Sequence, residues 1–123
     1  DVLLMYAEAC NELGESREAL DKLEMVRARA RRTVHPADMT VGLPEITETG
    51  KEKLREIIWN ERRIELALEG HRFFDLIRAD KMVPGYAEKM MKAHGKTNFS
   101  IAKHATFFIP QKQVDISQGV LKN

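Results

Sequence analysis

The sequence predicts an all-α fold, and three observations support this prediction. Apolar residues recur at spacings of three and four in several long stretches, as they do on one face of a helix. Charged residues make up 32% of the chain, above the usual share of about 25%, which is typical of long helices with solvated faces. Capping residues and glycines stand where these stretches begin and end. We expect a tetratricopeptide-like helical hairpin, a long bent helix and irregular extended C-terminal segments.

Residues 1–32 are predicted to form the helical hairpin. A first helix covers residues 2–13 and stops at Gly14, because glycine readily adopts the left-handed conformation that follows many helices. Ser16 is a candidate N-cap for the second helix, which runs to about Arg32. A link this short makes the two helices antiparallel. The hairpin is close in length to the tetratricopeptide repeat, and since such repeats need neighbours for stability, we expect further sequence upstream.

A loop over residues 33–48 and a bent helix pair over residues 49–80 are predicted to follow. Thr49 and Glu52 match a capping box at the start of the long helix. Gly70 is expected to bend this helix, and a short second helix resumes beyond it. The inner face of the long helix is predicted to contain Leu54, Ile57, Ile58, Ile64 or Glu65, and Leu68.

Residues 81–123 are predicted to contain one short helix and an irregular tail. The helix covers about residues 85–93, directly after Pro84. Residues 95–103 are expected to form a loop. Residues 106–110 form an apolar stretch that should be extended, because a proline keeps the residue before it out of the helical region. The last dozen residues show no clear period.

The charge of the chain is nearly balanced, at a net +1, so it provides no strong field for attracting nucleic acid or an anionic membrane. One basic cluster is expected to be a solvated helix C-terminus, where cations interact favourably with the helix dipole. Its arginines are Arg27, Arg29, Arg31 and Arg32, and their expected partners are Glu18, Asp21 and Glu24. No nucleic-acid partner is predicted. Cys10, the single cysteine, is expected to be a small buried apolar residue.

The densest group of charged residues lies between Glu61 and Arg78. Its glutamates recur every four residues, so they share one helix face. They could be acid–base machinery of an enzyme, or part of an ion-pair network that holds the helix bend. We favour the network, because one helix face gives no cleft across which two carboxylates could act. No catalytic residue is predicted, and the structural residues are Glu61, Arg62, Glu65, Glu69, Gly70, Arg72, Asp75 and Arg78.

Neither a metal site nor a cofactor is predicted. The histidines His35, His71, His94 and His104 lack the mutual spacing of metal ligands, and there is no H-E-x-x-H motif. There is also no glycine-rich loop between a strand and a helix to hold phosphate.

Aromatic residues could provide a platform for a sugar ring, which needs a flat and exposed aromatic face. Trp59 and Phe73 lie within predicted helices and are expected to pack in the core. Tyr86 and Phe99 are the two remaining candidates for ligand contact.

Three stretches of the chain together resemble the SusD/RagB family of outer-membrane nutrient-binding lipoproteins. The first lies between Leu3 and Ala30. The second contains N-E-R-R-I-E-L from Asn60 and E-G-H-R-F-F-D-L from Glu69, and the third is F-I-P-Q at residues 108–111. Their order and spacing resemble the C-terminal region of the family, and the resemblance covers essentially the whole chain.

The resemblance implies a non-catalytic, structural part of a cell-surface protein that binds glycan or another nutrient. Family members are built on tetratricopeptide-like hairpins, are anchored in the outer membrane by an N-terminal lipid, and work with a TonB-dependent (SusC-like) transporter. The resemblance also implies that the lipid anchor is absent from this chain, and that a glycan or peptide ligand is bound mainly by an upstream part of the protein. The alternative is a tetratricopeptide-like module for protein–protein interaction.

Overall fold

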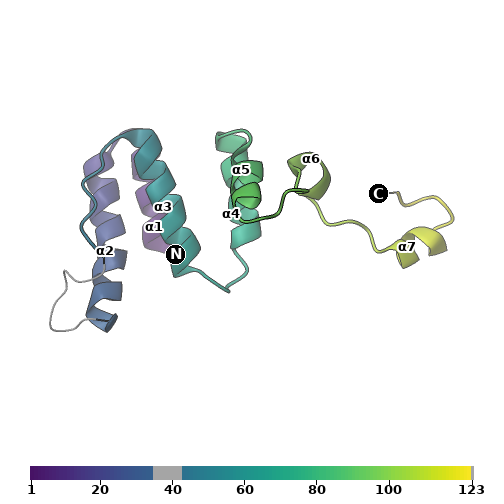
Figure 1. Ribbon diagram of the computed structural model, residues 1–123, viewed down its shortest axis with the longest axis horizontal. Helices are drawn as coiled ribbons and strands as arrows, with labels where there is room; N and C mark the ends of the chain where they lie inside the picture. The colour runs from purple at the N-terminus through teal and green to yellow at the C-terminus, as the bar shows by residue number, and fades with distance from the viewer. Residues whose placement is uncertain (35–42, 123) are drawn as a thin grey trace. The chain divides into compact units, whose positions relative to one another are not determined.

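The computed structural model describes residues 1–34 and 43–122, and within these ranges it contains helices and no strand (Figure 1). The all-α prediction is confirmed. No helix in the described part of the chain is long and apolar enough to cross a membrane. The chain divides into two compact units, Asp1–Arg72 and Phe73–Asn123. The helices are α1 (Val2–Leu13), α2 (Ser16–Val34), α3 (Lys51–Glu65), α4 (Arg72–Met82), α5 (Tyr86–Ala93), α6 (Ile101–His104) and α7 (Gln111–Ile116).

The first unit begins with a helical hairpin formed by α1 and α2. Gly14, with a φ of 87°, ends α1 as the sequence predicts. The amide of Gly14 donates to the carbonyl of Asn11, and the amide of Glu15 donates to that of Cys10. These two bonds form a Schellman motif, which satisfies carbonyls at the end of a helix and turns the chain back at once. The turn therefore follows directly from the position of one glycine.

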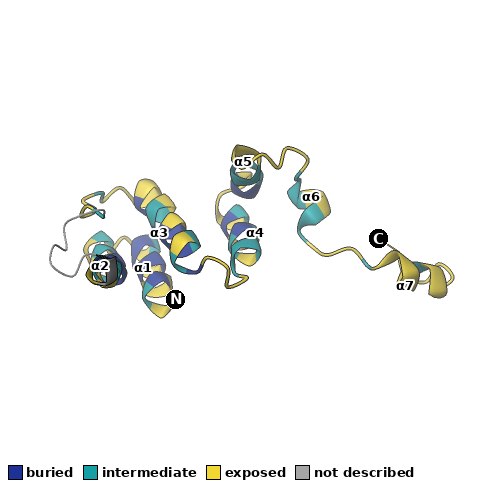
Figure 2. Ribbon diagram, turned by 60° about the horizontal axis from the view of Figure 1, so that its bottom comes forward, coloured by how far each residue is buried: buried dark blue, intermediate teal, exposed yellow. Residues whose placement is uncertain are grey.

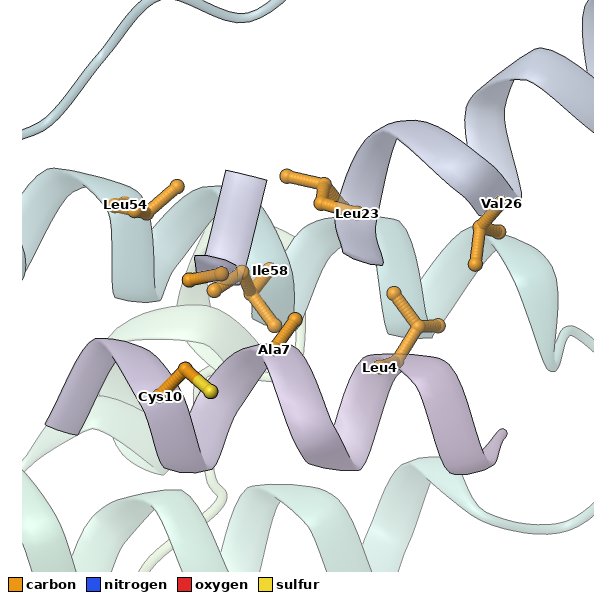
Figure 3. Close-up of a cluster of buried hydrophobic side chains, with 8 residues drawn as sticks. Leu4, Ala7, Cys10, Leu23, Val26, Leu54 and Ile58 are labelled. Atoms are coloured by element: carbon orange, nitrogen blue, oxygen red, sulfur yellow. The ribbon is translucent and has the colours of Figure 1, made fainter. Parts of the chain in front are cut away.

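Helix α3 lies against the hairpin and completes a three-helix core (Figure 3). Each of these helices has buried residues along one side and exposed residues along the other (Figure 2). Cys10 is buried in this core, as expected, and its burial raises the pKa of the thiol. The core cluster consists of Leu4, Ala7, Cys10, Ala19, Leu23, Val26, Leu54 and Ile58.

The N-terminus of α3 differs from the prediction. The helix begins at Lys51 with Gly50 as its N-cap, and no side chain caps it, so the predicted Thr49–Glu52 capping box is wrong. Because the helix starts after Gly50, its third position is occupied by Lys53, which cannot accept a hydrogen bond. Glu48 Oε1 instead accepts a bond from the Gly50 amide at 2.8 Å, which lowers the pKa of the Glu48 carboxyl.

Ser16 also has a different role from the one expected. It occupies the first helical position of α2 rather than the N-cap position. Its hydroxyl donates to the carbonyl oxygen of Thr49 at 3.1 Å. Ser16 therefore joins the start of α2 to the segment that leads into α3.

The prediction for the C-terminal half of α3 is wrong for Leu68, and of the two alternatives Ile64 and Glu65 it is Glu65 that is half-buried. Ile64 is 55% exposed and Leu68 is fully exposed, whereas Glu61 and Arg62 are buried. Leu68 lies beyond the end of the helix, with a φ of 70°, so a helical spacing does not apply to it. The interruption begins at Leu66, before Gly70, whose φ of 80° is the left-handed conformation expected of it.

The second unit contains α4 and α5, which lie side by side (Figures 1 and 2). Asp80 Oδ1 accepts a hydrogen bond from the amide of Ala87 at 2.8 Å and so joins the end of α4 to the start of α5. The buried residues of these two helices are Leu76, Ala79, Tyr86 and Ala87.

Helices α6 and α7 were not predicted, because the sequence favoured a loop at 95–103 and an irregular tail. They contain four and six residues, so neither is long enough to show an apolar period. The start of α6 is held by Glu88 Oε1, which accepts a bond from the Ile101 amide at 3.0 Å. Helix α7 contains no buried residue (Figure 2).

Candidate functional site

The charged residues of α2 and α3 face each other and form two ion pairs one helical turn apart. Arg27 Nη1 donates to Glu61 Oε2 at 2.7 Å, and both side chains are buried. Arg27 Nη2 also donates to the carbonyl oxygen of Pro44 at 2.8 Å. Arg29 Nη2 contacts both carboxylate oxygens of Glu65, at 2.5 and 2.7 Å, but the Arg29 side chain is 64% exposed.

The sequence predicted a solvated arginine cluster in α2, and this is correct for Arg29 and Arg32, which are exposed, but wrong for the other two arginines. Arg27 and Arg31 are buried, and Arg31 Nη1 donates to the carbonyl oxygen of Leu43 at 2.8 Å. Of the predicted acidic partners, Glu24 forms an ion pair with Arg31 of this cluster. The carboxylates that pair with Arg27 and Arg29 lie 34 and 36 residues away along the chain, so local spacing could not identify them.

A second set of polar contacts joins α1 to α3. Arg55 Nε and Nη2 donate to the two carboxylate oxygens of Glu12 at 2.5 and 2.8 Å. Asn11 Nδ2 donates to the Lys51 carbonyl oxygen at 2.9 Å. Further along, Trp59 Nε1 donates to Glu8 Oε1 at 2.8 Å, and both residues are buried. These contacts, which the sequence analysis missed, fix the position of α3 along the hairpin.

The Glu12–Arg55 pair predicts a specific acid sensitivity. Hydrogen bonds from Arg55 hold the pKa of the Glu12 carboxyl below 4.5, its ordinary value. The folded chain therefore keeps this carboxylate charged at a pH where the unfolded chain protonates it. Its contribution to stability is complete above pH 4.5 and is lost as the pH falls through the lowered pKa.

We expect Glu12→Gln to lower the free energy of unfolding near neutral pH and to reduce the loss of stability on acidification. The measurement is urea unfolding above and below pH 4.5. Glu56→Gln, an exposed carboxylate on the same helix as Arg55, is the matched control and should leave the acid sensitivity unchanged. Equal acid sensitivity of Glu12→Gln and the unsubstituted chain would contradict this assignment.

The remaining predicted structural residues lie at the turn after α3 and in α4. Glu69 is exposed at this turn, whereas Glu61 and Glu65 form ion pairs with arginines of α2. Arg62 contacts Asp1, and Arg78 Nη2 lies 3.7 Å from Asp75 Oδ1 within α4. The arginines that pair with Glu61 and Glu65 are thus Arg27 and Arg29 of α2, which were not among the predicted structural residues.

The ion-pair geometry favours the structural interpretation of Glu61 and Glu65. Both carboxylates accept hydrogen bonds from guanidinium groups of α2 at 2.5–2.7 Å, so these oxygens are engaged by contacts within the chain. In the ranges 1–34 and 43–122, no group of His, Cys, Asp and Glu residues could hold a metal ion. His35, named in the sequence analysis, lies outside the described residues.

The two candidate ligand residues have different environments. Tyr86 is buried at the start of α5, so its ring offers no open face to a sugar. Phe99 is half-buried and lies before α6, with its ring stacked on that of His104 at a centroid separation of 5.4 Å. Three further aromatic side chains are exposed: Phe74, Phe107 and Phe108.

The surface of the described residues includes two hollows of different composition. One, of about 250 Å³, lies between α2 and the segment before α3, and is lined by Arg17, Leu20, Asp21, Leu23, Glu24, Glu45, Ile46 and Thr49. The other, of about 320 Å³, is lined by Met91, Gly95, Lys96, Thr97, Asn98, Phe99 and His104. The first contains three carboxylates and no aromatic ring, whereas the second contains two aromatic rings and no carboxylate.

Comparison with known proteins gives a consistent result over the whole chain. The SusD family matches residues 1–123. SusD-like protein P38 of Formosa agariphila is 38% identical over 84 residues, which cover 68% of this chain and 16% of that protein. SusD-like proteins P2 and P25 of the same organism are 40% and 41% identical over 82 and 78 residues, and each match covers 63% of this chain.

The matched region spans 14–16% of the length of these three relatives. No solved structure matches the chain.

Proposed function

This chain belongs to the SusD family, and on that premise we propose that it is the C-terminal, structural part of a longer protein that binds glycan or another nutrient at the cell surface. The observation that most directly supports this proposal is the family match over residues 1–123. The small share of each relative that the match covers supports the view that ligand binding by the whole protein involves residues outside this chain.

The polar network of the first unit supports a structural role. The buried pair Arg27–Glu61 and the bidentate pair Arg55–Glu12 each join a residue of the hairpin to α3. Each guanidinium donates to a carboxylate within the chain, so these residues fix helix positions rather than present charge to a ligand. The proposed function is therefore non-catalytic.

The non-catalytic proposal is tested with the full-length protein and an oligosaccharide that it binds. We expect the oligosaccharide to be recovered intact after prolonged incubation. If it is hydrolysed, and if Glu65→Gln abolishes hydrolysis while the folded structure is retained, the face formed by Glu61 and Glu65 is catalytic and the proposal is wrong.

We propose further that the full-length protein is lipid-anchored in the outer membrane and acts with a TonB-dependent (SusC-like) transporter. This part rests on family membership alone. The test is affinity purification of the full-length protein from detergent-solubilised outer membranes. A transporter that co-purifies in stoichiometric amount supports the pairing, and recovery of the protein alone from fractions that contain the transporter would contradict it.

A protein–protein interaction module is the second candidate, because one observation favours it. The face of α1 opposite the core is apolar and exposed, through Val2, Met5, Tyr6 and Leu13. Exposed apolar stripes of this kind mark surfaces that other helices cover. If the full-length protein binds no glycan but captures a protein, and Leu13→Lys prevents that capture, this second function is the better one.

A further inference from the structure

The hollow beside Phe99 has the features of a binding site for a sugar ring. It lies where α5 ends and α6 begins (Figure 1), and its volume of about 320 Å³ is at the lower end of the range for small-ligand pockets. Two of its seven lining residues are aromatic, and Lys96, Thr97 and Asn98 supply polar groups. An aromatic surface with a few convergent polar groups is the usual composition of such pockets.

The backbone around this hollow is held by hydrogen bonds. Helix α5 ends at Ala93, Gly95 follows with a φ of 79°, and the amide of Lys96 donates to the carbonyl of Met91 at 2.9 Å. The amide of Phe99 donates to the Lys96 carbonyl at 3.2 Å, which closes the next turn. The positions of Lys96 and Phe99 are therefore set by the end of the helix and do not depend on a ligand.

The aromatic rings are also fixed. The rings of Phe99 and His104 stack with an angle of 23° between their planes. His104 Nδ1 lies 2.9 Å from the carbonyl oxygen and 3.1 Å from the amide nitrogen of Ser100, which holds the imidazole in place. Phe108 approaches His104 edge-on, with centroids 6.4 Å apart. A rigid aromatic group loses little conformational entropy when a sugar ring packs against it.

The charge around the hollow indicates which class of sugar it would bind. No acidic residue lines it, and Lys96 has no carboxylate partner among the described residues. Between residues 85 and 104 there are four lysines, Lys89, Lys92, Lys96 and Lys103, and one acidic residue, Glu88. Glu88 is already bonded to the Ile101 amide and lies 3.8 Å from Lys92 Nζ. The local field is positive and favours a negatively charged ligand.

We propose that this hollow binds an acidic sugar residue of a glycan, one that carries a carboxylate or a sulfate group. The sugar ring packs against the aromatic pair formed by Phe99 and His104, Lys96 pairs with the acidic group, and Asn98 and Thr97 bind hydroxyl groups. The inference rests on the proposed glycan-binding function, and it adds a site within this chain and the charge of the ligand.

The experiment uses the full-length protein and three probes of equal length: an oligogalacturonide, a sulfated oligosaccharide and a neutral oligosaccharide. Affinity is measured by titration calorimetry for the unsubstituted protein and for Phe99→Ala and Lys96→Ala. Phe74→Ala and Lys112→Ala remove an exposed ring and an exposed lysine that do not line the hollow, so they are the matched controls. Lys96 is exposed, so its substitution tests the site even where Phe99→Ala lowers the amount of folded protein.

We expect the protein to bind at least one acidic probe more tightly than the neutral one. Each site substitution should weaken that binding about tenfold, which corresponds to about 1.4 kcal/mol, and neither control should change it. Higher salt should weaken binding by the unsubstituted protein more than binding by Lys96→Ala.

Two outcomes separate the site from the proposed function. Binding of the neutral probe alone, or acidic binding that both site variants retain, overturns this site and leaves the glycan-binding function standing. Failure to bind any of the three probes, together with an absence of glycan binding on a wider array, overturns both.

Discussion

Replacing Glu61 with alanine is expected to lower the free energy of unfolding of the chain by about 3–5 kcal/mol. The substitution leaves the buried guanidinium of Arg27 without its carboxylate, although the Pro44 carbonyl still accepts one of its hydrogen bonds. An unpaired charge in the interior is costly, because water cannot solvate it there. Urea unfolding measures the effect through the fluorescence of Trp59, the single tryptophan, which is buried on the same helix.

Glu65→Ala is the matched control, because it removes the same chemical group one turn further along α3. Its partner Arg29 is largely exposed, so the expected loss is about 0–1 kcal/mol. A double variant, Arg27→Met with Glu61→Leu, should recover most of the stability that Glu61→Ala loses, since it removes both buried charges. Equal losses for Glu61→Ala and Glu65→Ala would show that burial does not distinguish the two pairs.

Ile58→Ala is expected to lower the free energy of unfolding by about 2–5 kcal/mol. The Ile58 side chain is fully buried in the core that α3 forms with the hairpin (Figure 3). The smaller side chain loses apolar contacts and leaves a cavity that the surrounding helices fill only in part. Urea unfolding of the chain, again followed by Trp59 fluorescence, measures the loss.

The control for this prediction is Ile64→Ala on the same helix. Ile64 is 55% exposed, so its truncation should change the stability by about 0.5 kcal/mol or less. The sequence predicted Ile58 on the inner face and left Ile64 and Glu65 as alternatives there, so the two variants also test which residues of α3 face the core. A large loss for Ile64→Ala would restore the sequence-based assignment.

The longer helices could be predicted from the sequence, because their stability depends on a local and periodic pattern. Helix α1 has the predicted bounds, and Gly14 alone accounts for its end. The start of α3 was predicted less well, because neighbouring residues can each act at a helix N-terminus. Gly50 is the N-cap, and Glu48, in place of Thr49, provides the side-chain hydrogen bond there. Helices α6 and α7 contain too few residues for a period to appear.

The partners of charged and aromatic residues could not be predicted in the same way. Arg27 looked like a solvated residue because its partner, Glu61, is 34 residues away and is brought to it only by the packing of α3. Tyr86 and Phe99 were equally plausible ligand residues in the sequence. The structure buries Tyr86 and leaves Phe99 at the edge of a hollow, and this difference depends on contacts between elements.

The central claim is that this chain is part of a glycan-binding protein, and a glycan-array screen of the full-length protein tests it most directly. Our account predicts binding to a defined set of glycans. If the folded full-length protein binds no glycan on an array that includes neutral, uronic-acid and sulfated polysaccharides, the claim is contradicted, and a peptide or protein ligand becomes the better interpretation.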